Sequence, residues 1–308
     1  MTWIATCRFS AGSCTLTLMI VDWRFKNFLL PVHMGKRQFR TDVPLAPFVP
    51  VIAPMIAAFT VAALIAAIAH RLGLLTVSGA AAAAMVGGAT LFAGLSWAIL
   101  LLFFFTTSTA LSWWRAAERD RLVSPLVEKA GPRDALQVLA NGGLFAMAAM
   151  LSTRGDAFAW QAVAAGAIAA ATSDTWSTEV GTVAGGTPIG ILSWRHVAPG
   201  TSGGITMRGT MAALAGAFAA ALVTTAVDWP ITLPAVLAGG IAGSIFDSVL
   251  GAAVQERRWC QNCGIQTERR IHSCGTSTVY RGGIRGCDND VVNLMSTIAG
   301  AVITWRIA

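Results

Sequence analysis

Carboxylates are scarce in this sequence, and several of them stand at the ends of long apolar segments rather than in polar loops. Asp and Glu together account for 15 of the 308 residues. An ionisable side chain at membrane depth costs roughly 3 kcal/mol or more, so such residues are retained mainly where they serve a function. The acids in this position, which are therefore candidate site residues, are Asp134, Asp174, Glu179, Asp247 and Asp290.

One polar face runs along the segment RDALQVLANGG. Arg133, Gln137 and Asn141 recur every four residues, so they share one side of an otherwise apolar helix, and Asp134 stands beside them. This set combines a cation, a carboxylate and two amides. We predict that all four residues contact a substrate phosphate.

Two further polar faces lie in the segments GSIFDSVLGAAVQ and CDNDVVNLMSTIAGA. Asp247 and Gln255 fall on one helical face with glycines at four-residue intervals, and glycine lets a neighbouring helix approach closely. Asp290 and Asn293 stand three residues apart where the last apolar segment begins. We predict that these acids and amides face the same site, with Gln255 contacting substrate.

The fourth polar face is TSDTWSTEVG, which follows an alanine-rich run. On a regular helix Asp174 aligns with Ser177 and Thr178, whereas Glu179 points elsewhere. We expect the apolar helix to end where this motif begins, and Gly181 to let the chain turn. Asp174 is therefore the first choice for a catalytic carboxylate, and Glu179 is the second.

Four polar helix ends on one side of a membrane describe a shared pocket. Carboxylate and amide oxygens suit Mg²⁺, which usually binds one or two carboxylates together with substrate phosphates. Asp174, Asp247 and Asp290 are the predicted Mg²⁺ ligands, and Glu179 and Asn293 complete the predicted catalytic set. For any single residue, the alternative is a structural role in an interhelical hydrogen bond or a helix cap.

The glycine-rich segment GTSGGITMRGT could bind an anion. Glycine lets the backbone turn its N–H groups toward a phosphate, and the helix that follows adds the positive end of its dipole. The segment is not a Walker A motif, because the GK[ST] ending is missing, and a flexible loop is the alternative. The phosphate-binding residues predicted in this region are Arg195, Gly200, Thr201, Ser202, Gly203, Gly204 and Arg208.

Four residues near the C-terminus have the spacing of metal ligands. A C-x-x-C pair, Cys260 and Cys263, precedes His272 and Cys274. Two such pairs could close a tetrahedral zinc site of the structural kind. Free thiols in a reducing compartment are the alternative.

The elements that must position these residues are membrane helices. The chain is 55% hydrophobic and 12% charged, whereas soluble domains carry about 25% charged residues. The sequence therefore predicts an all-α, polytopic transmembrane helical bundle of about eight spans with polar loops. The expected spans are 47–70, 77–94, 95–114, 135–152, 157–172, 209–227, 231–254 and 291–307.

Three polar connections, 115–134, 173–208 and 255–290, carry basic residues. The positive-inside rule places them at the cytoplasmic face, where we expect the active site. The net charge of +7 then reflects these loops, and we expect no nucleic-acid partner. Residues 1–46 are expected to be a poorly informative N-terminal extension, with Met34 as an alternative start, and residues 47–308 a single transmembrane domain.

Five motifs occur in the order DTWSTEVG, PGTSGGITMRGT, GSIFDSVLGAAVQ, C-x-x-C…TE…H-x-CG and DNDVVNLMSTIAGA. In this order they resemble the integral-membrane family that includes plant phytyl-phosphate kinase of the vitamin E pathway and its bacterial and archaeal relatives. The resemblance implies a kinase that adds a second phosphate to a phytyl or polyprenyl monophosphate. It implies a nucleoside triphosphate donor with CTP favoured. Mg²⁺ is the cofactor expected from the carboxylates, and the lipid bilayer is the partner expected of a membrane bundle.

Two other functions would use the same features. A cytidylyltransferase-type lipid-phosphate enzyme would release pyrophosphate from the same pocket, although the D-x-x-D-G-x-x-A-R signature of the CDP-alcohol transferases is absent. An ion-coupled transporter also places acids and broken Gly-rich helices in the membrane. The sequence leaves open the prenyl chain length, the donor and the oligomeric state.

Overall fold

The chain divides into two compact units, Met1–Val49 and Pro50–Ala308, each of which is described by itself. In the first unit, β1 (Thr2–Ser10) and β2 (Ser13–Val21) form an antiparallel hairpin. The second unit holds every predicted site residue. The computed structural model describes residues 2–10, 13–21, 49–114, 131–184 and 186–308.

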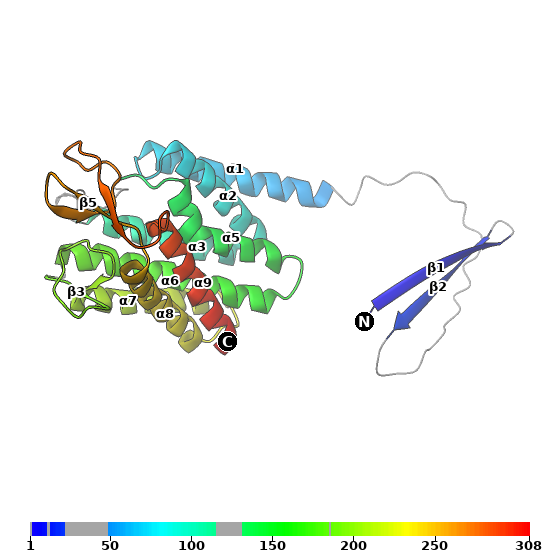
Figure 1. Cartoon of the computed structure of the whole chain (residues 1–308). Coiled ribbons are helices and arrows are strands. Elements are labelled where there is room, and N and C mark those ends of the chain that lie inside the picture. Colours follow the sequence, from blue (N-terminus) through cyan, green and yellow to red (C-terminus); the bar gives the residue numbers. More distant parts are fainter. Residues whose placement is uncertain (1, 11–12, 22–48, 115–130, 185) are drawn as a thin grey trace. The chain divides into compact units, whose positions relative to one another are not determined.

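The described part of the second unit contains eight helices, which pack as a bundle (Figure 1). The helical fold predicted from the apolar segments is therefore confirmed. Polar side chains cap several helices where the apolar segments begin, since they accept hydrogen bonds from the first free N–H groups. The helices are α1 (Val49–Arg71), α2 (Val77–Ala93), α3 (Leu95–Trp113), α5 (Ala135–Ser152), α6 (Ala157–Ala184), α7 (Met207–Ala226), α8 (Leu233–Ala253) and α9 (Asn289–Ile307).

Five of the described helices are long and apolar enough to cross a membrane by length and composition: α1, α3, α5, α7 and α8. The helix α2 is apolar but has only 17 residues. The helices α6 and α9, which carry several of the predicted site residues, are not among the five. The structure therefore confirms the predicted helices, but it does not confirm that eight of them span the membrane. Large apolar side chains such as Ile56, Leu64 and Ile68 stand exposed on α1, as expected of a surface that faces lipid.

The core of the bundle is built around α6, which contacts α3, α5, α7, α8 and α9. Its alanines from Ala164 to Ala171 are almost completely buried. Glycines on the neighbouring helices meet them directly: a Cβ atom at Gly300 would come within 2.7 Å of the Ala170 Cβ atom, and one at Gly240 within 3.1 Å of the Ala169 Cβ atom. Small residues thus permit the close helix packing that stabilises membrane bundles.

The predicted end of α6 at residue 172 was wrong, because the helix continues through the polar motif to Ala184. The polar side chains there bond within the bundle instead of requiring water. The Thr172 hydroxyl donates to the Ile168 carbonyl at 2.7 Å, and the Ser173 hydroxyl donates to the Ala213 carbonyl of α7 at 2.9 Å. Gly181 remains helical, and its lack of a side chain lets Gly209 of α7 pack against it.

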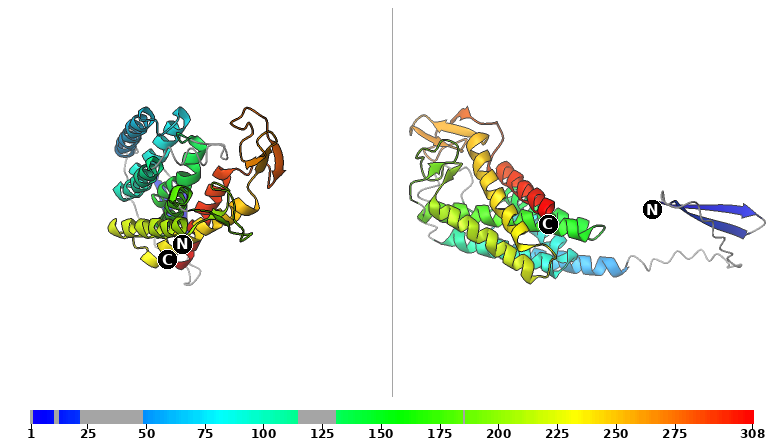
Figure 2. Two further views of the ribbon diagram at one scale, coloured as in Figure 1. Left: turned by 90° about the vertical axis from the view of Figure 1, so that its left-hand side faces the viewer. Right: turned by 90° about the horizontal axis from the view of Figure 1, so that it is seen from below.

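Two small sheets cover one end of the bundle, as Figures 1 and 2 show. The first is a hairpin of β3 (Ile189–Gly190) and β4 (Gly204–Ile205). The second is antiparallel, in the order β6-β5-β7, with β5 (Arg257–Cys260), β6 (Ile265–Thr267) and β7 (Val279–Gly282). The polar connections 173–208 and 255–290 therefore meet at the same end of the bundle. Most of the connection 115–134 lies outside the described residues.

Candidate functional site

A cavity of about 710 Å³ opens between the helices near the two small sheets. Helices α1, α2, α3, α5, α6, α8 and α9 line it, together with the polar connections. One part of its wall is apolar and the other is polar. The predicted site residues that line this cavity are Arg133, Gln137, Asn141, Asp174, Glu179, Asp247, Gln255, Asp290 and Asn293.

Helix α6 contributes two carboxylates to this cavity, Asp174 and Glu179, along with the hydroxyls of Thr175, Thr178 and Thr182. Glu179 was expected to point elsewhere than Asp174 on a regular helix, and it nevertheless lines the same cavity. Residues five apart on a helix are separated by about 140° around the axis, and the cavity wall is wide enough to include both. The hydroxyl of Ser112 on α3 donates to Glu179 Oε1 at 2.6 Å, which fixes this carboxylate at the wall.

Helix α8 places Asp247 beside Asp174, and the two carboxyl groups interact directly. The Asp247 Oδ1 atom is buried and has no hydrogen-bond partner among the described residues. Gly243 of α8 makes this approach possible, because a Cβ atom there would collide with Ala170 of α6. Two adjacent carboxylates repel each other unless a proton or a cation lies between them.

Asp290, in the first turn of α9, is the most deeply buried acid of the cavity, with 8% of its surface exposed. It is held there by the neighbouring Asp288, whose carboxylate accepts hydrogen bonds from the backbone N–H groups of Asp290 and Val291, both at 3.1 Å. Asn293, one turn further along α9, also faces the cavity. Asp288 itself also lines the cavity and was missed, so the described lining contains four aspartates, three of which lie on three different helices.

Helix α5 presents the predicted polar face to the cavity, with one exception. Gln137 and Asn141 line the wall, as does Arg133 in the segment before the helix. Asp134 is not among the lining residues. Its carboxylate accepts a hydrogen bond from the Gln137 N–H group at 3.0 Å, while the Gln137 side chain accepts one from the Asp134 N–H group. Asp134 therefore caps α5, which is the structural alternative to the predicted substrate contact.

The glycine-rich loop does not line the main cavity, contrary to expectation. The Ser202 hydroxyl and the Gln255 amide both donate to Glu268 Oε1, at 2.5 and 2.8 Å, so the loop lies behind Glu268. Gly203 has φ +75°, and a Cβ atom there would lie 2.7 Å from the Ser248 carbonyl of α8.

The glycines of this loop thus allow close packing, and they do not form a phosphate cradle in the cavity. Gly204 lies in β4 and pairs with Gly190 of β3. Gly200, Thr201 and Ser202 line a separate, smaller hollow of about 290 Å³.

Only one of the three predicted arginines, Arg133, lines the cavity. Arg195 is exposed in the connection between β3 and β4, and Arg208 donates to the Ala184 carbonyl at the end of α6. The second cation among the described lining residues is Arg270, which sequence reasoning missed. The signal that could have identified Arg270 was its position near Glu268 in the TERR segment. A loop position, however, has no helical periodicity that would indicate which way a side chain points.

Glu256 and Glu268 also line the cavity and were missed. Glu256 accepts hydrogen bonds from the Gly286 N–H group at 2.7 Å and from the Arg258 guanidinium at 2.6 Å. These contacts, the Gly286 N–H group foremost, lower the pKa of Glu256 below its ordinary value of 4.5. This glutamate is therefore an anion under all physiological conditions.

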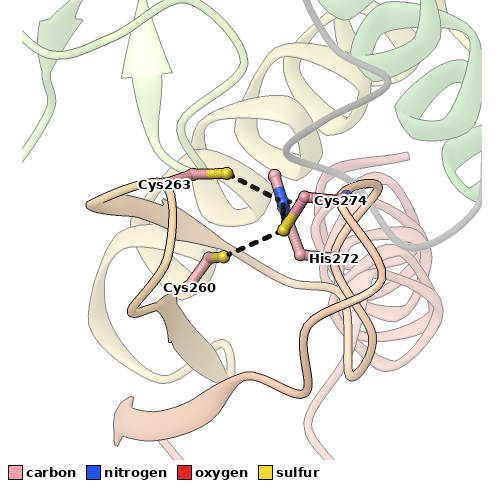
Figure 3. Close-up of side chains that lie close together, drawn as sticks. All are labelled: Cys260, Cys263, His272 and Cys274. Carbon is pink, nitrogen blue, oxygen red and sulfur yellow. Dashed lines mark hydrogen bonds between the residues drawn. The ribbon is translucent and has the colours of Figure 1, made fainter.

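The four predicted metal ligands, Cys260, Cys263, His272 and Cys274, come together outside the cavity (Figure 3). Their ligand atoms all lie within 4.8 Å of one another. Hydrogen bonding with Thr276 and then His272 lowers the pKa of the Cys274 thiol to about 5, whereas hydrogen bonding to Cys274 raises that of Cys263 to about 11. One thiol of the cluster is thus more acidic than an ordinary cysteine.

The rest of the cavity wall is apolar. It consists mainly of aliphatic and aromatic side chains from the first three helices, among them Val61, Ile65, Val86, Leu102 and Phe105. This wall is continuous with the polar part through α3, whose last turn carries Ser112. The cavity can therefore hold a ligand with a charged head and a hydrocarbon tail.

The family model described as "Integral membrane protein DUF92" matches residues 60–301, so the chain belongs to this family of integral membrane proteins. Over 85 residues the chain is 40% identical to "Uncharacterized membrane protein MJ0933" of Methanocaldococcus jannaschii. That segment is 27% of this chain and 35% of the relative, so the match spans about a third of the relative's length. No solved structure matches the chain.

Proposed function

We propose that this DUF92 member is a membrane-embedded phosphotransferase of the phytyl-phosphate kinase type. It would convert a phytyl or polyprenyl monophosphate into the diphosphate with a nucleoside triphosphate, CTP being the favoured donor. One observation carries the proposal: a single cavity joins a cluster of aspartates, amides and arginines to an apolar wall. A lipid monophosphate has the same two parts, and the ordered motifs that resemble the kinase family supply several of the lining residues.

The apolar wall accounts for the choice of a prenyl-type acceptor. The cavity volume of about 710 Å³ falls within the range of about 300–1,000 Å³ that is usual for small-molecule sites. Helices α1 and α3, which supply much of the wall, are long and apolar enough to cross a membrane. A hydrocarbon chain could thus enter from the bilayer with its phosphate directed to the polar end.

Arg133 and Arg270 would neutralise the phosphates at that end. The planar guanidinium group donates two parallel hydrogen bonds to phosphate oxygens, and it does so most strongly where water is excluded. The amides of Asn141 and Asn293 would orient these oxygens. Arg195 and Arg208, which do not line the cavity, have no part in the proposed chemistry.

Asp174, Asp247 and Asp290 would hold Mg²⁺. The residues fit this ion, because adjacent carboxylates with an unpartnered buried oxygen at Asp247 provide hard, negatively charged ligands. When bound, Mg²⁺ would supply positive charge to the donor phosphates. Glu179, fixed by Ser112, and Glu268, fixed by Ser202 and Gln255, would stay at the wall as positioning groups.

In the proposed reaction, an oxygen of the lipid monophosphate attacks the γ-phosphorus of the donor. A new P–O–P bond forms, the bond from the γ-phosphorus to the β–γ bridging oxygen breaks, and the nucleoside diphosphate leaves with that electron pair. No general base is required, because the acceptor phosphate is already ionised at neutral pH. The basic residues of the polar connections would place this end at the cytoplasmic face, where nucleotides are available.

The proposal is tested with the purified protein in detergent or nanodiscs. Phytyl or geranylgeranyl monophosphate is supplied with Mg²⁺ and CTP, ATP, GTP or UTP in turn, and lipid diphosphate and nucleoside diphosphate are quantified by mass spectrometry. Equal amounts of the two products are expected with at least one donor. If no donor yields a lipid diphosphate while an ion gradient drives solute uptake into proteoliposomes, the protein is a transporter instead.

A further inference from the structure

Three thiols and one imidazole converge on a common centre at the polar end of the bundle (Figure 3). The Cys260 and Cys274 Sγ atoms are 3.6 Å apart, and the Cys263 Sγ atom is 3.6 Å from His272 Nδ1. The His272 Nδ1 and Cys274 Sγ atoms are 3.1 Å apart. Four ligand atoms at such distances surround a space about as wide as a single ion.

Two of these separations, both 3.6 Å, agree with a tetrahedral zinc site, and the third, 3.1 Å between His272 Nδ1 and Cys274 Sγ, is shorter. With Zn–S bonds of about 2.3 Å and a Zn–N bond of about 2.0 Å, the edges of the tetrahedron are about 3.5–3.8 Å long. A disulfide would require a sulfur–sulfur distance of about 2.05 Å, and a cluster of three thiols always leaves one of them unpaired. The arrangement of Cys260, Cys263, His272 and Cys274 therefore suits one cation better than an oxidised pair.

The backbone at both ligand pairs is folded into tight turns. After Cys263, Gly264 has φ +66° and its N–H group donates to the Cys260 carbonyl at 2.9 Å. After Cys274, Gly275 has φ +81° and its N–H group donates to the His272 carbonyl at 2.8 Å. Glycine adopts this left-handed backbone without strain, so each turn can hold its two ligands side by side.

The segment that carries the ligands needs such a link, because it lacks a core of its own. The flap, defined as residues 257–282 from β5 to β7, is shorter than the roughly 40 residues below which a metal or disulfides are usually required. Of its large apolar side chains, Ile271, Val279 and Tyr280 are 64%, 40% and 39% exposed, and Trp259 and Ile265 are only half-buried. Hydrophobic burial within the flap therefore contributes little to its stability.

We propose that Cys260, Cys263, His272 and Cys274 bind one Zn²⁺ as a closed structural site that holds the flap in place at the cavity. Four protein ligands leave no open coordination position, and none of the four lines the cavity. Glu268 and Arg270, which do line it, lie in the chain between the two ligand pairs. The ion thereby fixes two cavity residues without touching them, and zinc binding does not depend on whether the cavity has kinase activity.

The test begins with the metal content of the full chain, purified in detergent without added zinc and measured by mass spectrometry. About one zinc ion per chain is expected. Replacement of the ion by Co²⁺ should give the visible absorption bands and the thiolate charge-transfer band of a tetrahedral site with three sulfur ligands. The proposal is overturned if the wild-type chain holds less than about 0.1 zinc and Co²⁺ gives no such bands.

Cys263→Ser and Cys287→Ser form a matched pair of variants, since Cys287 is a free thiol outside the cluster. We expect C263S to lose zinc and C287S to keep it. Circular dichroism of both variants checks that the helices persist. Because C263S could fail to fold, the wild-type chain is also treated with a chelator, and proteolysis should then cut within 257–282 before the helices. Equal zinc in both variants, or an unchanged flap after complete zinc removal, contradicts the proposal.

Discussion

The carboxyl group of Asp174 on α6 faces that of Asp247 on α8 at the polar end of one cavity, and the Asp247 Oδ1 atom has no hydrogen-bond partner among the described residues. The glycine and alanine surfaces of α6 and α8 allow this approach. Such a pair is costly inside a helical bundle unless a proton or a cation lies between the two carboxylates. In the proposed function, Mg²⁺ is the cation that the two carboxylates would hold.

Removal of either charge should abolish most of the activity. We expect Asp174→Asn and Asp247→Asn each to lower kcat about 100-fold or more with no loss of helix content, since each removes a charged ligand of the proposed Mg²⁺ ion. The double variant should be hardly worse than either single one, because the two act as a unit. Steady-state kinetics at several Mg²⁺ concentrations provides the measurement.

The control for these variants is Asp134→Asn, an acid of the same region that caps α5 and does not line the cavity. Asparagine caps helices as well as aspartate does, so kcat should change by less than about twofold. A large loss in D134N with an intact fold would contradict the assignment of Asp134 as a cap.

Arg270 should contribute to phosphate binding, although it lies on the flap and far from the other site residues in sequence. Arg270→Ala should raise the KM for an anionic substrate about tenfold or more, as expected for the loss of a charge-assisted hydrogen bond. Arg270→Lys should restore only part of the lost affinity for the anionic substrate, because the ammonium group lacks the planar pair of donors of a guanidinium. Arg195→Ala is the matched control, and if it raises KM as much as R270A does, the cavity is not where phosphate binds.

Gly203 should matter for packing and not for phosphate binding. Gly203→Ala places a methyl group 2.7 Å from the Ser248 carbonyl at φ +75°, whereas Gly73→Ala has a similar φ of +73° with nothing within 4 Å. The left-handed conformation alone costs roughly 1–2 kcal/mol, so G73A should be mildly destabilised and G203A clearly more. Thermal unfolding in detergent measures this difference. Equal melting temperatures for the two variants would be inconsistent with the packing described.

The stability of the polar end should depend on pH through Glu256. Its folded-state pKa is depressed by the Gly286 N–H group and Arg258, so its contribution is present above the ordinary value of 4.5 and is lost as the pH falls through the folded-state pKa. Wild type should melt at a higher temperature than Glu256→Gln at pH 6, and the gap should narrow below pH 4.5. If the difference in melting temperature between wild type and Glu256→Gln stays constant over this pH range, the substitution acts through the shape of the side chain and not through its charge.

The helices follow from the sequence because their signals are local. Apolar segments of suitable length, with caps such as Thr76 and Thr206 before them, define helix starts without knowledge of the fold. The end of α6 does not follow, since Ser173 is accommodated by a carbonyl of α7, which lies 40 positions away in the chain. A polar residue marks a helix end only where no such partner exists.

Part of the site could be predicted from the sequence because its signals are also local. Charged and amide side chains inside apolar segments stand out, and nine of them indeed line one cavity. Loop residues such as Glu268 and Arg270 carry no periodic signal, and only the folded flap brings them to the wall. In GTSGGITMRGT the glycines indicated backbone freedom, but the sequence could not show that α8 would occupy the space beside Gly203.

The position of the transferred phosphorus provides the most direct test of the account. Wild-type protein receives phytyl monophosphate and CTP labelled with ³²P at either the α or the γ position, with parallel reactions for γ-labelled ATP, GTP and UTP. If the protein is the proposed kinase, γ-label enters the lipid as a diphosphate, α-label does not, and Asp247→Asn abolishes the transfer. Entry of α-label would establish nucleotidyl transfer instead, and the absence of lipid label with every donor would contradict the proposed phosphotransferase.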